Sequence, residues 1–148
     1  MSRINEANEE MKRADHLLFV TLKYTRTTDV IKNAIGRLVN AFDNGVIHAL
    51  EILKKKKKLK EIPLSPVSRA EVLRDLTKRD LYMLDYLNLY FLLRKIYHAE
   101  YTKKEEFRKH VTLTVMHKDE AIEVNINKLE EYYNKAREFV DYVAEKYK

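Results

Sequence analysis

The sequence has no cysteine, no tryptophan and no glutamine, and only two glycines and two prolines among its 148 residues. Without cysteine, the chain can form neither disulfide bonds nor thiolate metal sites, and it has no cysteine nucleophile. The scarcity of glycine leaves few positions for tight turns, which disfavours an all-β fold. A chain of this length can bury one core without cross-links, so we expect a single domain over residues 1–148. High Lys and Glu content with few thermolabile residues is typical of hyperthermophile proteins.

Long apolar runs are also missing, and the first residues do not have the pattern of a signal peptide. No stretch of about 18 uncharged apolar residues occurs, so we expect no membrane-spanning segment. The N-terminus, "MSRINEANEEMKR", is polar and unlike a secretory signal, which predicts a cytoplasmic protein with no membrane partner. The net charge of +6 favours acidic partners, nucleic acid first among them.

Apolar residues instead recur at helical spacing through most of the chain. One stripe, over residues 4–24, consists of Ala7, Met11, Ala14, Leu18 and Leu22. A second stripe keeps its phase through "DNG" at 43–45, which predicts a kinked but continuous helix. Its members are Ile31, Ile35, Leu38, Phe42, Val46, Ala49 and Leu53.

Both prolines lie in "EIPLSPVS" at 61–68, which predicts a loop. Ser68 and Glu71 have the spacing of a capping box and predict a short helix over "RAEVLRDL". Residues 79–101 are apolar on almost all sides, which predicts a central helix surrounded by the others. Asp85 and Asn88 are polar residues midway along this apolar helix, where a charged side chain would need a basic partner.

The region after Tyr101 combines a helix signal with the only β signal. Thr102 and Glu105 repeat the capping-box spacing and predict a second short helix. β-Branched residues then alternate on both sides of "HKDE", which predicts a hairpin over 111–126. We expect the last helix to start at Asn127 and to bury Leu129, Tyr133, Ala136, Val140, Val143 and Tyr147. The sequence therefore predicts a mainly α fold, a bundle of four or five helices with a small β-hairpin before the last helix.

Arg94 and His98, in "LRKIYHAEY", are the strongest candidates for a chemical site. Four residues apart on a helix, they lie on one face, which Tyr90 and Tyr101 share. Histidine can transfer a proton near neutral pH, and arginine can bind a phosphate through two hydrogen bonds. This pair suits RNA cleavage, because the neighbouring 2′-hydroxyl supplies the nucleophile. The alternative is a helix end with two polar residues in solvent.

Other candidates carry weaker signals. The lysine run Lys54, Lys55, Lys56, Lys57 and Lys58 could bind phosphates, or it could be a solvated helix end. The tyrosines at 82, 86, 90, 97 and 101 could stack on bases, although packing is the commoner role at helical spacing. His98, His110 and His117 show no metal-ligand spacing, so we expect no metal and no cofactor. Ser65 and Ser68 are typical of turn and cap positions, not of nucleophiles.

The helix order and the Arg94/His98 pair resemble the HEPN superfamily of small all-α domains. The matching segments are "AFDNGVIHALEILKK", the central helix and "KLEEYYNKAREFVDYVAEKY". Many HEPN proteins are dimeric, metal-independent ribonucleases, and some are toxins paired with small nucleotidyltransferases. Their Arg and His are separated by four to six residues, whereas three separate Arg94 from His98 here. Pairing Arg108 with His110 or His117 fits the family spacing no better.

This resemblance implies an RNA-binding or metal-independent RNA-cleaving protein that forms a homodimer and could pair with a nucleotidyltransferase-type partner. His98 would transfer the proton and Arg94 would bind the phosphate. Lys54–Lys58, Arg108 and Lys109 would guide the RNA electrostatically. The competing hypothesis is a non-catalytic helical interaction or scaffold protein whose Arg94 and His98 form a degenerate site.

Overall fold

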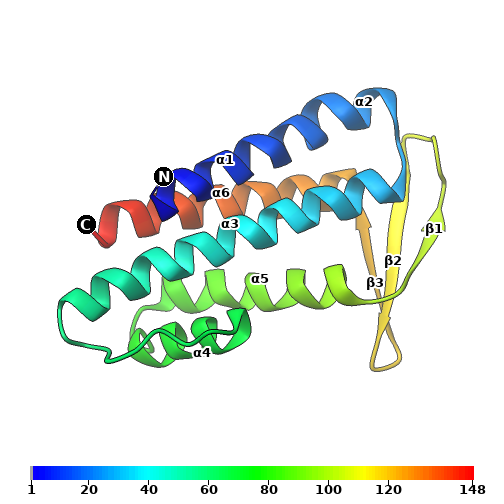
Figure 1. The fold of residues 1–148 in the computed structure, drawn as a ribbon. Helices are drawn as coiled ribbons and strands as arrows, with labels where there is room; N and C mark the ends of the chain where they lie inside the picture. The colour runs from blue at the N-terminus through cyan, green and yellow to red at the C-terminus, as the bar shows by residue number, and fades with distance from the viewer. Residues whose placement is uncertain (1) are drawn as a thin grey trace.

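The computed structural model describes residues 2–148 as a helical bundle with a small antiparallel sheet across one end (Figure 1). The first helical segment consists of α1 (Arg3–His16), the π-helical turn η1 (Leu17–Thr21) and α2 (Leu22–Tyr24). The helices α3 (Thr28–Lys55), α4 (Pro66–Leu76) and α5 (Leu81–His98) follow. The strands β1 (Tyr101–Lys104), β2 (Thr112–His117) and β3 (Glu120–Asn125) precede α6 (Ile126–Lys146). Within residues 2–148, no helix combines the length and the apolar character needed to cross a bilayer.

The central helix of the bundle is α3, which contacts α1, α4, α5 and α6. The prediction that residues 79–101 form a helix surrounded by others is therefore wrong. One side of α5 faces solvent, and its exposed residues include Leu81, Tyr82, Asp85, Asn88 and Lys95. Asp85 has a basic partner, as expected, but the pair with Lys135 lies at the surface and not in the core. Apolar residues on this open side gave α5 the composition of a buried helix.

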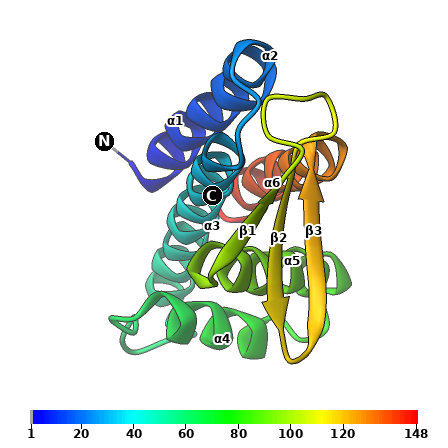
Figure 2. The ribbon, with the colours of Figure 1, turned by 90° about the vertical axis from the view of Figure 1, so that its right-hand side faces the viewer.

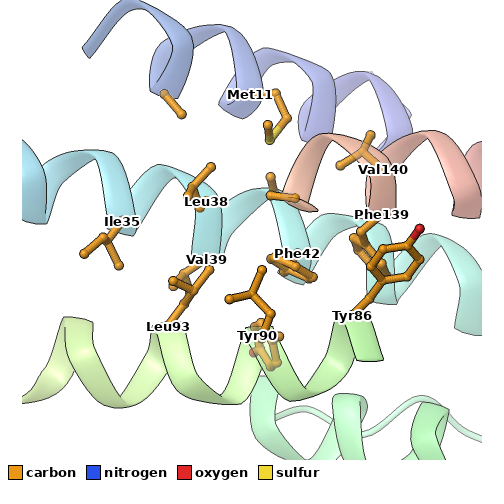
Figure 3. Close-up of a cluster of buried hydrophobic side chains, with 14 of the residues drawn as sticks. Met11, Ile35, Leu38, Val39, Phe42, Tyr86, Tyr90, Leu93, Phe139 and Val140 are labelled. Atoms are coloured by element: carbon orange, nitrogen blue, oxygen red, sulfur yellow. The ribbon is translucent and has the colours of Figure 1, made fainter. Parts of the chain in front are cut away.

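The predicted apolar stripes of the first two helices form the core (Figure 3). All five residues of the first stripe are buried, and in the second only Leu53 is partly exposed. The α3 helix continues without interruption through residues 43–45. Gly45 serves close packing: a Cβ atom there would lie 2.5 Å from Cε2 of Phe139, whose ring stacks on Phe42 at 4.5 Å. Phe139 is a core residue that the predicted stripe of the last helix omitted.

Two helices begin earlier than the sequence predicted. The α4 helix starts at Pro66, and Ser65, not Ser68, is its cap, with Ser65 Oγ accepting the Ser68 N–H at 3.2 Å. Proline is favoured at this first position because its fixed φ suits a helix and no N–H is needed there. The α6 helix starts at Ile126, and Asn125 caps it by accepting the Lys128 N–H at 2.8 Å.

The predicted hairpin is confirmed as β2 and β3, paired from Thr112↔Asn125 to His117↔Glu120. Lys118 and Asp119 connect the strands with φ angles of 50° and 67°, as a two-residue hairpin turn requires. The predicted helix after Tyr101 is wrong. These residues form β1, which pairs with β2 from Tyr101↔Val115 to Lys104↔Thr112. The free edge of β2 supplied hydrogen-bond partners that outweighed the local capping signal.

The sheet, in the order β1-β2-β3, lies across one end of the helices (Figure 2). Leu113, Val115 and Val124 are buried, and the strands that carry them contact α3 and α6. The C-terminus lies at the opposite end of the bundle (Figure 1). The structure therefore has two distinct ends, one formed by the sheet and the other by the loop that follows α3.

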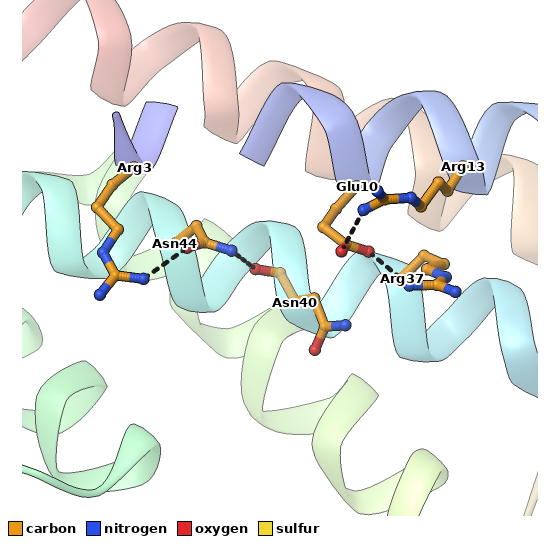
Figure 4. Close-up of polar contacts among 6 residues, drawn as sticks. All are labelled: Arg3, Glu10, Arg13, Arg37, Asn40 and Asn44. Carbon is orange, nitrogen blue, oxygen red and sulfur yellow. Dashed lines mark hydrogen bonds and ion pairs between the residues drawn. The ribbon is translucent and has the colours of Figure 1, made fainter. Parts of the chain in front are cut away.

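A polar cluster fastens α1 to α3 (Figure 4). Glu10 on α1 is nearly buried and accepts hydrogen bonds from Arg13 at 2.8 Å and from Arg37 of α3 at 3.3 Å. At the first residue of α1, Arg3 donates to Asn44 of α3 at 3.2 Å. Burying the Glu10 carboxylate is tolerable because two guanidinium groups neutralise it.

Candidate RNA-contacting surface

Arg94 and His98 occupy the last two turns of α5, next to the sheet. The helix ends at His98 because Ala99 adopts an extended conformation, with ψ of 154°, that leads the chain into β1. His98 is exposed and its ring meets Tyr97 edge-on, with centroids 5.3 Å apart. Arg94 is partly buried, with its guanidinium carbon 5.9 Å from the centre of the Tyr90 ring. Among residues 2–148, neither side chain has an ion-pair partner within 4.0 Å.

An acidic residue on α3 faces this pair. Asp43 accepts a hydrogen bond of 2.5 Å from the Tyr90 hydroxyl. Burial raises the pKa of Asp43, while the Tyr90 hydrogen bond and the charges of Arg94, Arg69 and His98 oppose that rise. Burial and the hydrogen bond to Asp43 in turn raise the pKa of Tyr90. Three basic side chains, from α4 and α5, therefore lie close enough to act on one carboxylate.

Sequence reasoning missed Asp43 and Arg69 as members of this cluster. The usable signal was the polar "DNG" inside the apolar stripe of α3, which was interpreted as a kink. Arg69 gave no signal, because its proximity depends on how α4 folds back onto α3.

The two tyrosines expected on the supporting face have different surroundings. Tyr90 is fully buried and packs against Phe42. Tyr101 is partly exposed, and its hydroxyl donates to Asp29 at the start of α3. The ammonium of Lys32 lies 5.5 Å from the Tyr97 ring and 5.1 Å from the Tyr101 ring. These contacts join the end of α5 to the first turns of α3.

The remaining tyrosines of α5 also differ from one another. Tyr86 is buried and meets Phe139 at 5.7 Å, as the packing interpretation predicted. Tyr82 instead is 69% exposed.

The lysine run and the Arg94/His98 pair lie at different ends of the bundle. Lys54–Lys58 are exposed where α3 ends. The end of α5 lies beside the beginning of α3, since the Tyr97 ring covers Gly36. Eighteen residues of helix, or about 27 Å, separate Gly36 from Lys54. The lysines therefore do not belong to the surface around His98.

Arg108 and Lys109 lie instead at the sheet end, in the exposed loop between β1 and β2. Arg108 forms an ion pair of 3.9 Å with Glu105 of the same loop. The alternative pairing of Arg108 with His117 is remote, because β2 carries His117 roughly 20 Å away from His110. Across the described chain, residues 2–148, no three His, Asp or Glu side chains gather as a metal ion would need.

The arrangement has the chemical groups for contact with a phosphodiester. His98 is open to solvent and can exchange a proton with a bound molecule. Arg94 retains N–H donors that no carboxylate within 4.0 Å occupies in residues 2–148, and Lys32 and Arg69 add positive charge nearby. Asp43 counterbalances part of this charge from the inner side of the cluster.

No protein-family model, no curated protein and no solved structure matches this chain.

Proposed function

We propose that this protein binds single-stranded RNA at the sheet end of the bundle and cleaves it without a metal ion. The observation that carries the proposal is the pairing of an exposed His98 with a partly buried Arg94 on adjacent turns of α5. The net charge of +6 supports an anionic substrate. A relationship to the HEPN superfamily is part of this proposal, supported by the mainly helical fold, although β1–β3 are not a feature that the resemblance implies.

The proposed reaction is an internal transesterification. His98 accepts the proton of the RNA 2′-hydroxyl, whose oxygen attacks the adjacent phosphorus. Arg94 binds the non-bridging phosphate oxygens and stabilises the charge that develops on them. The P–O5′ bond breaks, leaving a 2′,3′-cyclic phosphate on one product. The departing 5′-oxygen takes a proton from water or from the imidazole of a second copy of the chain, as a homodimer would allow.

The test is an RNA cleavage assay in excess chelator, with product ends identified by mass spectrometry. The wild-type chain should cleave and yield 2′,3′-cyclic phosphate ends. His98→Ala should lower the rate about 100-fold to 10,000-fold, the usual contribution of a general acid or base. The matched control is His16→Ala, which changes an exposed histidine on α1. Wild-type rates in His98→Ala, or loss of all activity on chelation, would overturn the mechanism.

Arg94 provides a second test, because lysine keeps the charge but cannot form two parallel hydrogen bonds. Arg94→Lys should therefore retain part of the RNA affinity and lose most of the rate. Equal rates for Arg94→Lys and wild type would remove Arg94 from the transition state.

The second candidate is a non-catalytic interaction protein. It is favoured by apolar residues that are exposed on α4, on α5 and in the loop before α4. Leu64 is 95% exposed, Leu81 is 75% exposed, and Tyr82 and Leu76 lie nearby in sequence. Exposed apolar groups of this kind are typical of association surfaces. If this surface joins two copies of the chain, Leu81→Asp should convert dimers to monomers in analytical ultracentrifugation. If the wild-type chain is a monomer, self-association is excluded.

A further inference from the structure

The loop of residues 105–110, between β1 and β2, holds an aromatic side chain out into solvent. Phe107 is 73% exposed. Its φ angle of 64° and that of Glu105, 57°, lie in the left-handed region that non-glycine residues rarely adopt. Such a conformation is unfavourable for a bulky residue and persists only where surrounding contacts impose it.

Two contacts hold this loop against the turn between α2 and α3. The Phe107 N–H donates to the Arg26 carbonyl at 2.6 Å. The Glu106 carboxylate accepts from the Thr28 hydroxyl at 2.8 Å and from the Thr28 N–H at 3.2 Å. Because Thr28 is fully buried at the first turn of α3, Glu106 anchors the loop to the bundle. Phe107 is thus presented by a fixed backbone.

The same contacts bring a second aromatic residue to this end of the molecule. Tyr24, the last residue of α2, is 85% exposed and precedes Arg26 by two positions. Figures 1 and 2 both place the β1–β2 loop beside the end of α2. A hollow of about 230 Å³ lies between the turn after α2, the end of this loop and the start of α6, and it is lined by Arg26, Lys109, His110, Asn125, Ile126 and Asn127.

Positive charge predominates around this hollow. The end of α2, the turn after it and the loop carry Lys23, Arg26, Arg108 and Lys109, whereas Lys103 of β1 pairs with Asp29 at 3.8 Å. The Glu106 carboxylate accepts the hydrogen bond from Thr28, and Glu105 forms an ion pair with Arg108. Aromatic faces that flank basic side chains are the features with which proteins bind single-stranded nucleic acid, by stacking on bases and neutralising phosphates.

We infer that Phe107 and Tyr24 stack on bases of a single-stranded RNA whose phosphate is bound in the hollow by Arg26 and Lys109. The identity of this ligand rests on the proposed function, but the binding surface is separate from Arg94 and His98. A membrane surface fits less well, because the hollow is lined by polar and charged side chains together with Ile126.

The experiment measures binding to a 2′-O-methyl RNA oligonucleotide that contains 2-aminopurine. The methyl group blocks the nucleophile, so the wild-type chain can be used whether or not it cleaves RNA. Stacking of an aromatic ring on 2-aminopurine changes the fluorescence of the base, and titration gives the affinity. We expect Phe107→Ala to weaken binding about 5-fold to 150-fold and to abolish the fluorescence change. Phe107→Trp should keep both.

Four further variants locate the effect. Met116→Ala removes another exposed apolar side chain, from β2, and should bind like wild type. Glu106→Ala keeps the Phe107 ring but releases the loop, so it should weaken binding as Phe107→Ala does. Arg26→Ala and Lys109→Ala should each reduce the slope of log affinity against log salt by about 0.7, the value for one phosphate of a single strand. Circular dichroism checks that each variant is folded.

The outcomes separate this inference from the cleavage proposal. Affinity and fluorescence unchanged in Phe107→Ala would overturn the inference, even if the wild-type chain cleaves RNA. Phe107-dependent binding without any cleavage of ordinary RNA would support the inference and overturn the mechanism at His98. Phe107-dependent binding to vesicles of anionic phospholipid, with no binding to the oligonucleotide, would overturn the inference in favour of a membrane ligand. No binding to the oligonucleotide at all would overturn the inference, while the cleavage assay with ordinary RNA would still decide the mechanism at His98.

Discussion

Tyr90 on α5 donates a hydrogen bond of 2.5 Å to Asp43 on α3, joining two residues that are 47 positions apart in the sequence. Burial raises the pKa of Asp43 despite this hydrogen bond and the nearby charges of Arg94, Arg69 and His98. The ionised carboxylate therefore reduces the stability of the fold at neutral pH. It also reduces the positive potential around Arg94.

Asp43→Asn should gain stability relative to wild type as the pH rises. A raised folded-state pKa means that the native protein binds this proton more tightly than the unfolded chain does. Wild-type stability should consequently fall between the ordinary carboxyl pKa near 3.8 and the raised value, and the variant should not show this component. Urea denaturation at pH 4 and pH 7 measures it. Asp85→Asn, at an exposed site, is the control, and an equal pH response in both variants would contradict the prediction.

Asp80 should show the opposite pH dependence. Burial opposes its ionisation, but hydrogen bonds from Lys146, Tyr142 and the Met83 N–H outweigh burial and lower the pKa of the carboxyl. The stability that Asp80 contributes is therefore present above the ordinary pKa near 3.8 and is lost as the pH falls through the lowered folded-state value.

Asp80→Ala should reduce the free energy of unfolding by about 2 kcal/mol at pH 7, since it removes the cap of α5 and the partner of Lys146. The loss should shrink as the pH falls from the ordinary carboxyl pKa through the lowered folded-state pKa of Asp80. Asp141→Ala, which breaks an exposed pair with Arg137, should cost less than about 1 kcal/mol. A loss from Asp80→Ala that is constant from pH 7 to pH 2 would refute the electrostatic explanation.

The two glycines of α3 should respond differently to alanine. Gly45→Ala forces a methyl group against the buried Phe139 ring, and the net loss should be about 1–2 kcal/mol despite the better helix propensity of alanine. Gly36→Ala meets the Tyr97 ring at 2.6 Å, but Tyr97 is partly exposed and can move aside. We expect Gly36→Ala to change stability by less than about 0.5 kcal/mol, because the propensity gain offsets the displacement. Thermal denaturation of both variants would show equal losses if core packing at Phe139 were unimportant.

Glu10 should be the most sensitive charged residue on α1. Glu10→Ala leaves Arg13 and Arg37 facing each other without their common acceptor, and we expect a loss of about 1–2 kcal/mol in urea denaturation. Glu9→Ala removes an acceptor of Lys12 on the exposed side of the same helix and should cost less than about 0.5 kcal/mol. Similar losses at the two positions would mean that the bridge from α1 to α3 contributes little.

The sequence predicted the helical framework well where the signal is local. Apolar residues at helical spacing identified the buried faces of α1, α3 and α6, because a helix brings residues three and four apart to one side. The prediction from sequence failed where a local helix signal competed with strand pairing to a distant segment. Thr102 and Glu105 have capping-box spacing, yet residues 101–104 pair with β2. Nothing within Tyr101–Lys104 identifies that partner.

The same distinction between local and distant relationships applies to the candidate site. The sequence by itself determined that Arg94 and His98 lie on one face of a helix, since their spacing fixes this wherever the helix packs. Only the tertiary structure decided that Asp43 and Arg69 approach that face, that Lys54–Lys58 lie at the far end of α3, and that the loop of Phe107 is anchored to Thr28. These relationships join segments that are far apart in the chain, so they depend on how whole helices and strands pack and not on residue spacing within one element.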